Sequence, residues 1–385
     1  MPKAVIDKGI AKFYNIINNY LLRDCVMRIL NVIPDIGISN GVMSVVLNYA
    51  KAMPENIVFD ILYFQDKEKT RREDIEALGG RVYKIPFPSV KALFVNNELE
   101  EILKEHGGEW SAVHIHCPHF TAFIAPLAKK YGINKICTHC HTTCYSLTPE
   151  NEKRNKLLFN LGKNGADKYF ACSKEAGRLW YKKSDFTVLN NAVDCKKFAF
   201  DEAKREEAQG LLQTKDCFVV GHIGRTDIAQ KNHPFLIDAF AQIKKQKDNA
   251  VLLLVGAEPT EELSQKIKNL GIESSVRFLG LRDDVDLVLQ AVDLFLFPST
   301  NEGLPVSVIE AQAAGLPVLM SDSITGEVKI TDNVCELSLN LPASQWAEKA
   351  IEISKCERRS TLEEMKKSGW DIFDCAKKLA DYYSA

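Results

Sequence analysis

Short apolar runs of strand length alternate with amphipathic helical patterns along most of this chain. In the first half the apolar runs lie at 27–33, 57–64, 81–85, 112–116, 135–141 and 168–173. The second half repeats the plan at 217–224, 250–256, 276–280, 293–299 and 317–322. Strands that alternate with helices predict parallel sheets with helices on both faces. Two such series in 385 residues predict an α/β protein with two doubly wound, Rossmann-like domains.

The regions outside these two series are short. A polar stretch rich in Lys and Glu at 195–215 is the predicted linker between the domains. Residues 1–26 precede the first predicted strand and form an N-terminal extension with apolar side chains at helical spacing, namely Ile6, Ile10, Phe13, Ile17 and Leu21. This helix could lie in a membrane interface. The alternatives are a packed helix, or an upstream extension before a true start at Met27.

Charge and cysteine content exclude some classes of protein. The net charge of −2 excludes the general electrostatic footprint of a nucleic-acid-binding protein. Residues 1–195 carry a net charge of +5, and the remainder carries a net charge of −7. A basic first half could face an anionic membrane or a phosphate-bearing acceptor. The alternative is ordinary scatter of charge over two solvated surfaces. We expect neither a transmembrane helix nor a signal peptide. Eleven Cys without the spacing of a small disulfide scaffold favour a reducing cytoplasm.

Two acids eight residues apart, Glu302 and Glu310, flank the start of a predicted helix. Gly303, Leu304 and Pro305 open that segment, and Pro305 suits the first helical position, where its missing N–H costs nothing. The free N–H groups of a first helical turn attract phosphate. Glu310 lies in an otherwise apolar stretch, so its charge needs a partner or a ligand. The segment therefore predicts a site for the diphosphate and the hydroxyls of a sugar nucleotide.

A second loop, after the strand at 217–223, carries Gly224, Arg225 and Lys231. Arg can hold a diphosphate with its planar fork, and Lys adds a mobile point charge. Both cations could equally be solvated surface residues. Because ligands bind beyond the carboxyl ends of parallel strands, this loop and the segment around Glu302 should share one cleft.

The first half offers a facing wall. The loop 35–41 contains glycines that permit close approach of a ligand, but no G-x-G-x-x-G dinucleotide fingerprint is present. Two strand ends rich in His, at 114–119 and 137–144, suggest zinc. We favour the alternative that most of these His and Cys are core residues whose polar atoms have hydrogen-bond partners, because neighbours along a strand point to opposite faces. His141 is the exception, since it sits where the strand pattern ends and can reach a cleft.

Taken together, these motifs resemble the retaining, nucleotide-sugar-dependent glycosyltransferases of family 4 (glycosyl transferases group 1), which have the GT-B architecture. The resemblance covers nearly everything from residue 27 onward. It rests on Glu302 and Glu310 with Pro298-Ser299 before them and Gly315-Leu316-Pro317-Val318 after them, on Gly224-Arg225 with Lys231-Asn232, on Asn191-Ala192-Val193-Asp194 with Phe198, and on Ala171-Cys172-Ser173 with Ala176-Gly177.

The resemblance implies the following roles. Arg225, Lys231 and the amides of Gly303 and Leu304 would hold the diphosphate of the sugar donor. Glu310 would accept from ribose hydroxyls, Glu302 from hydroxyls of the transferred sugar, and His141 would line the cleft near that sugar. Asn40-Gly41 matches a Gly-Gly loop in which Asn replaces the first Gly.

The resemblance also implies the organisation and setting of the chain. The final helix would cross back, so that 27–195 with 366–385 form the acceptor-side domain and 196–365 the domain that binds the nucleotide sugar. The sugar donor would be a nucleotide sugar, most commonly a UDP-sugar, and the acceptor a glycan or a polyprenyl-linked saccharide. No metal or other cofactor is implied. Residue 327 and the region 335–354 look closest to enzymes of capsule and exopolysaccharide synthesis, which places the chain in the cytoplasm or on the inner face of the plasma membrane.

Two rival functions fit the same architecture. A sugar-nucleotide epimerase would act on the sugar donor without an acceptor. A non-catalytic carbohydrate-binding or nucleotide-binding module would bind tightly without turnover, although the presence of all four of Arg225, Lys231, Glu302 and Glu310 argues against it. The missing glycine fingerprint disfavours a Rossmann dehydrogenase.

Overall fold

The computed structural model describes residues 26–38, 40–87, 97–146, 149–226 and 229–385. The helix predicted for residues 1–24 lies outside them. Among the described residues, no helix combines the length and the apolar character that crossing a membrane requires.

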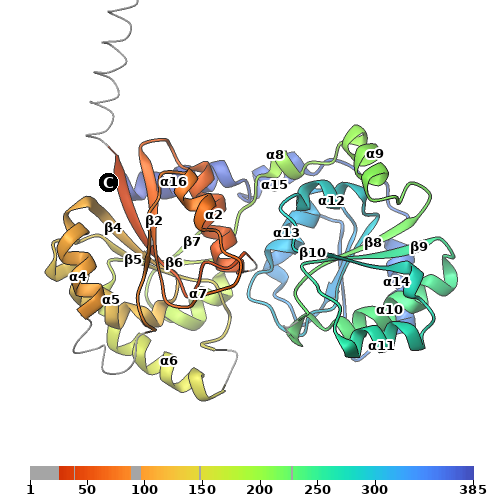
Figure 1. Cartoon of the computed structure of the whole chain (residues 1–385), viewed down its shortest axis with the longest axis horizontal. Coiled ribbons are helices and arrows are strands. Elements are labelled where there is room, and N and C mark those ends of the chain that lie inside the picture. The colour runs from red at the N-terminus through yellow and green to blue at the C-terminus, as the bar shows by residue number, and fades with distance from the viewer. Residues whose placement is uncertain (1–25, 39, 88–96, 147–148, 227–228) are drawn as a thin grey trace, which may run out of the picture.

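The first of two parallel sheets has seven strands in the order β3-β2-β1-β4-β5-β6-β7 (Figure 1). Its strands are β1 (Met27–Val32), β2 (Ile57–Tyr63), β3 (Val82–Lys84), β4 (Trp110–Ile115), β5 (Ile136–Cys140), β6 (Lys168–Ala171) and β7 (Thr187–Val188). The intervening helices are α2 (Gly41–Ala52), α3 (Arg72–Ala77), α4 (Asn97–His106), α5 (Thr121–Lys130), α6 (Pro149–Gly162) and α7 (Lys174–Tyr181). We call this sheet with its helices the first domain.

The second sheet has six parallel strands in the order β10-β9-β8-β11-β12-β13. Its strands are β8 (Phe218–Ile223), β9 (Ala250–Val255), β10 (Val276–Gly280), β11 (Leu294–Phe297), β12 (Val318–Ser321) and β13 (Val334–Leu337). The helices around it are α9 (Glu202–Leu211), α10 (His233–Gln246), α11 (Glu261–Asn269), α12 (Val285–Ala291), α13 (Val306–Ala313) and α14 (Ala343–Ile353). We call this part the second domain, and the predicted two-domain α/β architecture is confirmed.

The connecting segments are folded as well. The stretch predicted as a linker contains two helices, α8 (Cys195–Phe198) and α9, and Arg205 of α9 forms an ion pair with Asp293 of the second domain. Further along, α15 (Leu362–Lys367) leads to the last helix, α16 (Ile372–Ser384). Figure 1 shows α16 beside α2 in the first domain. There Ile372, Leu379 and Tyr383 are buried in the core of that domain, so the chain crosses back after completing the second domain.

The sheet order determines where loops can form a site. In each domain the chain reverses its direction of winding beside the first strand, between β1 and β4 and between β8 and β11. The loops that leave these strands at their carboxyl ends border a crevice in this kind of fold. Among the described residues they include 33–38 and 40 after β1, 224–226 and 229–232 after β8, and 298–305 after β11.

Candidate functional site

A cleft of about 410 Å³ lies between the two domains. Every residue that the sequence placed in the site lines it, from both domains: Asn40, Gly41, His141, Gly224, Arg225, Lys231, Glu302, Gly303, Leu304 and Glu310. Residues without a predicted role, including Arg71, Thr142 and Asn191, line it too. The geometry therefore brings the predicted residues together in one cleft.

Helix α13 points its N-terminus at this cleft. The helix begins at Val306, and Pro305 is its N-cap, so the prediction that Pro305 is the first helical residue was wrong by one position. The cap residue has an extended backbone (φ −70°, ψ 114°) and no side chain accepts from the first turn. Val306 and Ser307 line the cleft directly beyond it. Their N–H groups are the ones that a phosphate oxygen can use.

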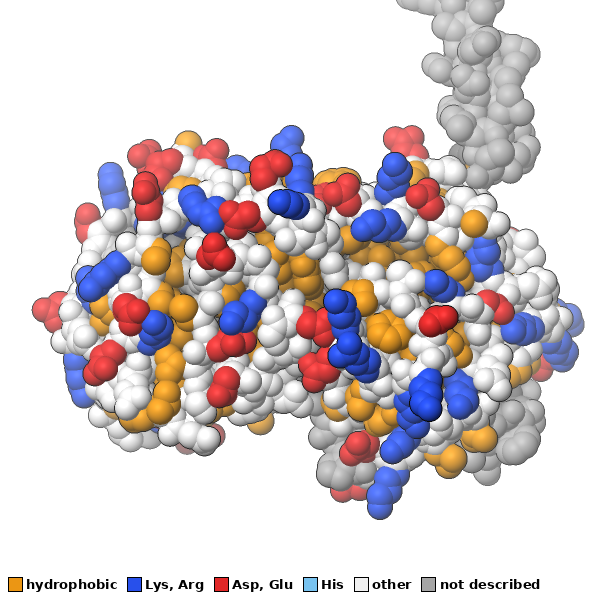
Figure 2. Space-filling model, turned by 180° about the vertical axis from the view of Figure 1, so that it is seen from behind, with side chains coloured by type: hydrophobic (Ala, Val, Ile, Leu, Met, Phe, Trp, Pro, Cys, Tyr) orange, Lys and Arg blue, Asp and Glu red, His pale blue; other side chains and the backbone are white. Residues whose placement is uncertain are grey.

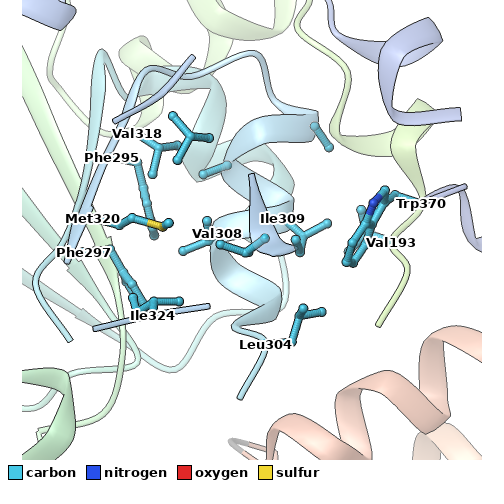
Figure 3. Packing of buried hydrophobic residues seen from close by; sticks show 14 of the residues in the cluster. Val193, Phe295, Phe297, Leu304, Val308, Ile309, Val318, Met320, Ile324 and Trp370 are labelled. Atoms are coloured by element: carbon cyan, nitrogen blue, oxygen red, sulfur yellow. The ribbon is translucent and has the colours of Figure 1, made fainter. Parts of the chain in front are cut away.

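Packing on two sides holds α13 in place. Figure 3 shows Val308 turned toward Phe295 and Met320 of the sheet, and Ile309 turned toward Val193 and Trp370. All of these side chains are buried, and both helix residues are fully so. Since interiors of this kind are close-packed, the helix end that faces the cleft has little freedom to move.

Gly303 lies against the first domain. A Cβ atom at this position would come 2.6 Å from the carbonyl oxygen of His141 and 3.0 Å from Cα of Thr142. Only a residue without a side chain permits this approach of two backbones. Leu304 follows with a buried side chain, so it offers the cleft its backbone.

Lys231 and Glu302 form an ion pair inside the cleft. Lys231 Nζ lies 2.8 Å from Glu302 Oε1, with the side chains 14% and 13% exposed, and 4.8 Å from the centre of the Phe297 ring. The stem of Lys231 passes over Gly224, where a Cβ atom would come 3.0 Å from its Cδ. The alternative of a solvated surface cation is therefore wrong for Lys231. A bound diphosphate and a sugar hydroxyl would compete with this pair for its two partners.

Glu310 is an acid without a protein partner. No described group donates a hydrogen bond to its carboxyl, which is partly exposed toward the cleft. Loss of hydration raises its pKa to about 8, against a small opposing effect of Lys197. A carboxyl that sits unpaired among apolar neighbours is suited to accept from ligand hydroxyls.

On the other wall of the cleft, Asn40 occupies the position of the first Gly in the family's Gly-Gly loop, and its side chain has a structural role there. Its side-chain oxygen accepts from the N–H groups of Val42 and Met43, and so caps α2. Its amide nitrogen donates to the carbonyl oxygen of Asp35. The Asn side chain is thus occupied by the helix it starts, and Gly41 beside it has open space around its Cα.

His141 belongs to a buried network rather than standing free in the cleft. Its Nε2 lies 2.9 Å from His116 Nδ1, and its Nδ1 lies 3.1 Å from Asn191 Oδ1. His116 Nε2 in turn lies 3.1 Å from Asn31 Oδ1. A ligand that bonds to a ring nitrogen of His141 must therefore displace His116 or Asn191.

This network is one proton short at neutral pH. The amide groups of Asn31 and Asn191 donate to the carbonyl oxygens of Ile29 and Leu304, so both amides turn their oxygens toward the rings. The three ring contacts then need three protons, whereas two neutral imidazoles supply two. Burial lowers the pKa of His116 and lowers that of His141 to about 4, so both rings are neutral. One of the three contacts is consequently not a hydrogen bond.

Four histidines share one face of the first sheet. The rings of His114 and His116 stack with centres 4.2 Å apart, and those of His139 and His141 lie 4.1 Å apart. The argument that strand alternation separates these residues was wrong, because side chains two positions apart point to the same face. His139 also contradicts the expectation of satisfied core histidines, since neither ring nitrogen has a hydrogen-bond partner among the described residues.

The positions of the stacked histidine rings bear on the alternative of a zinc site. One nitrogen each from His114, His116 and His139 lies within 4.8 Å of the others. A tetrahedral zinc ion needs nitrogens about 2.0–2.1 Å from one centre. The planes of the first two rings differ by only 15°, so their nitrogens lie side by side instead of converging.

Contacts between the domains surround the cleft. Asn191, which carries the His141 contact, also donates to the carbonyl oxygen of Leu304, 3.2 Å away in the second domain. Arg71 pairs with Asp283 at 2.6 Å. The carboxylate of Glu327 accepts from the first two N–H groups of α7, 2.8 and 2.7 Å away. A helix N-terminus of the first domain is thus capped by an acid of the second.

Sequence reasoning gave Asn191, His116 and Arg71 no role in the site. The signal for His116 was available, since a His-x-His pair on a strand shares one face with its neighbour. Asn191 and Arg71 depend on how the two domains meet, which no local pattern records.

Both halves of this chain match models of known protein families. A family model described as Glycosyltransferase Family 4 matches residues 39–197, and one described as Glycosyl transferases group 1 matches residues 217–355. EpsF of Bacillus subtilis, named as a glycosyltransferase, is 31% identical over 373 residues, which cover 93% of this chain and 96% of EpsF. This chain belongs to the group 1, family 4 glycosyltransferases. The family predicted from the motifs is confirmed.

Other glycosyltransferases resemble this chain over a shorter stretch or at lower identity. An Escherichia coli protein named as a UDP-Gal:alpha-D-GlcNAc-diphosphoundecaprenol alpha-1,3-galactosyltransferase is 31% identical over 156 residues, or 39% of each chain. HepE of Anabaena, solved with UDP and glucose, has a TM-score of 0.74 at 20% identity and covers 93% of this chain and 100% of its own. WaaG has a TM-score of 0.65 at 17% identity, with 94% of this chain covered and 100% of its own. These structures support the GT-B fold.

Replacement of Gly303 by Ala should open the contact between the domains. The added methyl group meets the His141 carbonyl at 2.6 Å, so Gly303→Ala should lower the free energy of unfolding by about 1–3 kcal/mol. Urea denaturation measures this change. Gly210→Ala is the matched control, because Gly210 lies in helix α9 with open space around it and should tolerate Ala. Equal stability of the two variants would contradict the steric argument.

Asn191→Ala should destabilise the protein by about 1–3 kcal/mol, because it leaves the Leu304 carbonyl and a His141 nitrogen without their partner. The conservative change Asn191→Asp should instead raise the pKa of His141, since a carboxylate favours the charged ring. NMR titration of the histidines measures that shift. Asn48→Ala removes a longer, 3.5 Å amide contact to Ala192 and serves as the control. An unmoved His141 titration in the Asp variant would refute the network.

Glu310→Gln should stabilise the protein in a way that depends on pH. The folded carboxyl, with a pKa of about 8, keeps its proton where an unfolded Glu, near 4.5, has lost it. The native state therefore binds more protons between these values, and wild-type stability falls relative to Glu310→Gln as the pH rises from about 4.5 to about 8. Thermal midpoints across this range measure the gap. Glu348→Gln, on the exposed face of α14, should give a flat difference. A flat gap for Glu310→Gln would show that burial does not shift this carboxyl.

Proposed function

We propose that this glycosyltransferase moves a hexosyl or N-acetylhexosaminyl group, with retention, from a UDP-sugar to a glycan or lipid-linked saccharide in the assembly of an exopolysaccharide or capsule. The observation that carries the proposal is one cleft in which Arg225, Lys231 and the N-terminus of α13 face Glu302 and Glu310. Cations and helix N–H groups suit a diphosphate, and carboxyl oxygens suit sugar hydroxyls.

The relatives support the finer parts of this proposal. The HepE structures contain UDP or UDP-glucose, which favours uridine as the base. The galactosyltransferase relative is named for a diphosphoundecaprenol acceptor, which favours a lipid-linked one here. The match to EpsF over almost the whole chain favours an exopolysaccharide pathway. Retention and the cytoplasmic setting rest on the family resemblance.

In the proposed mechanism, cleavage of the bond between the sugar and the diphosphate leaves negative charge on the leaving group. Arg225, Lys231 and the N–H groups at the start of α13 stabilise that charge, and such preorganised electrostatics are usually the largest contribution to rate. The proposal needs no metal, since Arg225 and Lys231 would neutralise the diphosphate. It also needs no acid, because a nucleoside diphosphate is a good leaving group.

The carboxylates hold the sugar donor in this mechanism. Glu302 accepts from hydroxyls of the transferred sugar once Lys231 turns to the phosphate, and Glu310 accepts from the ribose. The acceptor enters from the first domain, beside His141. Contact between the domains around Gly303 excludes water, which would otherwise hydrolyse the activated sugar.

Arg225→Ala tests the diphosphate site. We expect kcat/KM for sugar transfer to fall by about 10²–10³-fold, as for the loss of one preorganised donor of charge stabilisation. The matched control is Arg282→Ala, because Arg282 lines the same cleft but is held by Asp284 through two hydrogen bonds of 2.7 and 2.5 Å. Transfer and UDP release are measured with a panel of nucleotide sugars.

The outcomes separate the rival functions. Near-wild-type transfer by Arg225→Ala and Glu310→Ala would refute the site. Conversion of a UDP-sugar into an epimer or free sugar without any acceptor would favour an epimerase. Tight binding of UDP-sugar without turnover by the wild-type protein, across acceptors, would favour a binding module.

A further inference from the structure

The outer face of α6 exposes leucine side chains. Among the described residues, the three most exposed large hydrophobic side chains are Leu157, Leu161 and Leu211, which are 60%, 63% and 65% exposed. The first two are one helical turn apart on α6. The inner face of the same helix already buries Leu158 and Phe159, so packing of the domain does not use the outer leucines.

Cations flank these two leucines. Lys153, Arg154 and Lys156 are all exposed on α6, and none forms an ion pair within the described parts of the chain. We call these three cations with Leu157 and Leu161 the α6 surface. Figure 2 shows Lys and Arg side chains gathered on the lower part of the first domain, where α6 lies. The first turn of α6 also holds Glu150 and Glu152, so the helix carries three cations against two acids. The helix of Leu211, α9, has the opposite balance, with three Glu against Lys204 and Arg205.

The charge of the first half of the chain is concentrated in this region. Residues 129–168 contain eight Lys or Arg and three Asp or Glu, a balance of +5. This equals the whole excess of residues 1–195, so the rest of that half is neutral. Two of the eight cations, Lys129 and Lys130, form ion pairs with Asp167 and Glu100.

The α6 surface lies close to the cleft along the chain. His141, Thr142, Thr143 and Cys144 line the cleft, and α6 begins at Pro149. A helix of 14 residues is about 20 Å long.

We propose that the α6 surface docks this protein on an anionic lipid bilayer. Exposed leucines can enter the boundary between headgroups and acyl chains, while Lys and Arg beside them contact lipid phosphates. Two copies of the α6 surface would repel each other, which disfavours self-association through this face. Docking here would hold the first domain at the bilayer, where a lipid-linked acceptor would be presented. That last consequence rests on the proposed function, whereas the docking itself does not.

Vesicle flotation with the full chain tests the docking. Wild-type protein should bind phosphatidylglycerol-rich vesicles and lose that binding on phosphatidylcholine vesicles or at 1 M NaCl. Lys153→Gln with Lys156→Gln should weaken the partition about thirty-fold, since each Lys near an anionic surface contributes about 1 kcal/mol. Leu157→Ser with Leu161→Ser should weaken it at least about tenfold. Leu211→Ser is the matched control and should bind as wild type does.

Other measurements make each outcome decisive. All variants alter exposed side chains, so circular dichroism and thermal midpoints should match wild type, as should transfer to a short water-soluble acceptor. Unchanged vesicle binding by both α6 double variants would overturn the proposal and assign binding to another part of the chain. Absence of wild-type binding would overturn it too. A lower solution mass of the leucine variant, without vesicle binding by wild type, would instead assign the surface to contact between proteins. Failure of sugar transfer with intact vesicle binding would count against the proposed function alone.

Discussion

The burial of helix α13 is the constraint on which the site depends. Val308 on one side and Ile309 on the other are fully buried, so the helix is fixed between the second sheet and the segment that returns to the first domain. Its N-terminus can then point only at the cleft. The same packing holds Glu310 one turn further on, where burial raises the pKa of its carboxyl to about 8. One well-packed helix thus sets both the position of the N–H groups and the chemistry of the acid.

The second constraint is that the two domains complete each other's groups. Asn191 satisfies a carbonyl of the second domain with one atom and a histidine of the first with another. Glu327 caps α7 across the boundary. These contacts mean that the cleft exists as described only when the domains are together. The shape of the cleft and the contact between the domains therefore depend on the same hydrogen bonds.

Sequence patterns predicted the architecture because parallel strands buried on both faces leave strong apolar runs. They failed for β13, which contains a charged Glu336, and for β7, which has only two residues. The loops of the cleft were predictable because sheet order brings the carboxyl ends of strands together. The Lys231–Glu302 pair and the histidine network were not, since both depend on side-chain directions and on the approach of distant segments. Pro305 missed its position by one residue because cap geometry, and not propensity, decides where a helix starts.

Gly303 also limits how this enzyme can change over evolutionary time. Its identity is dictated by a backbone atom of the other domain, 162 positions earlier in the chain. A recombination event that replaced one domain with that of a homologue would succeed only if the incoming loop left the same gap at this point. The halves of the molecule are therefore not freely exchangeable modules, because a loop of one must leave room for the backbone of the other.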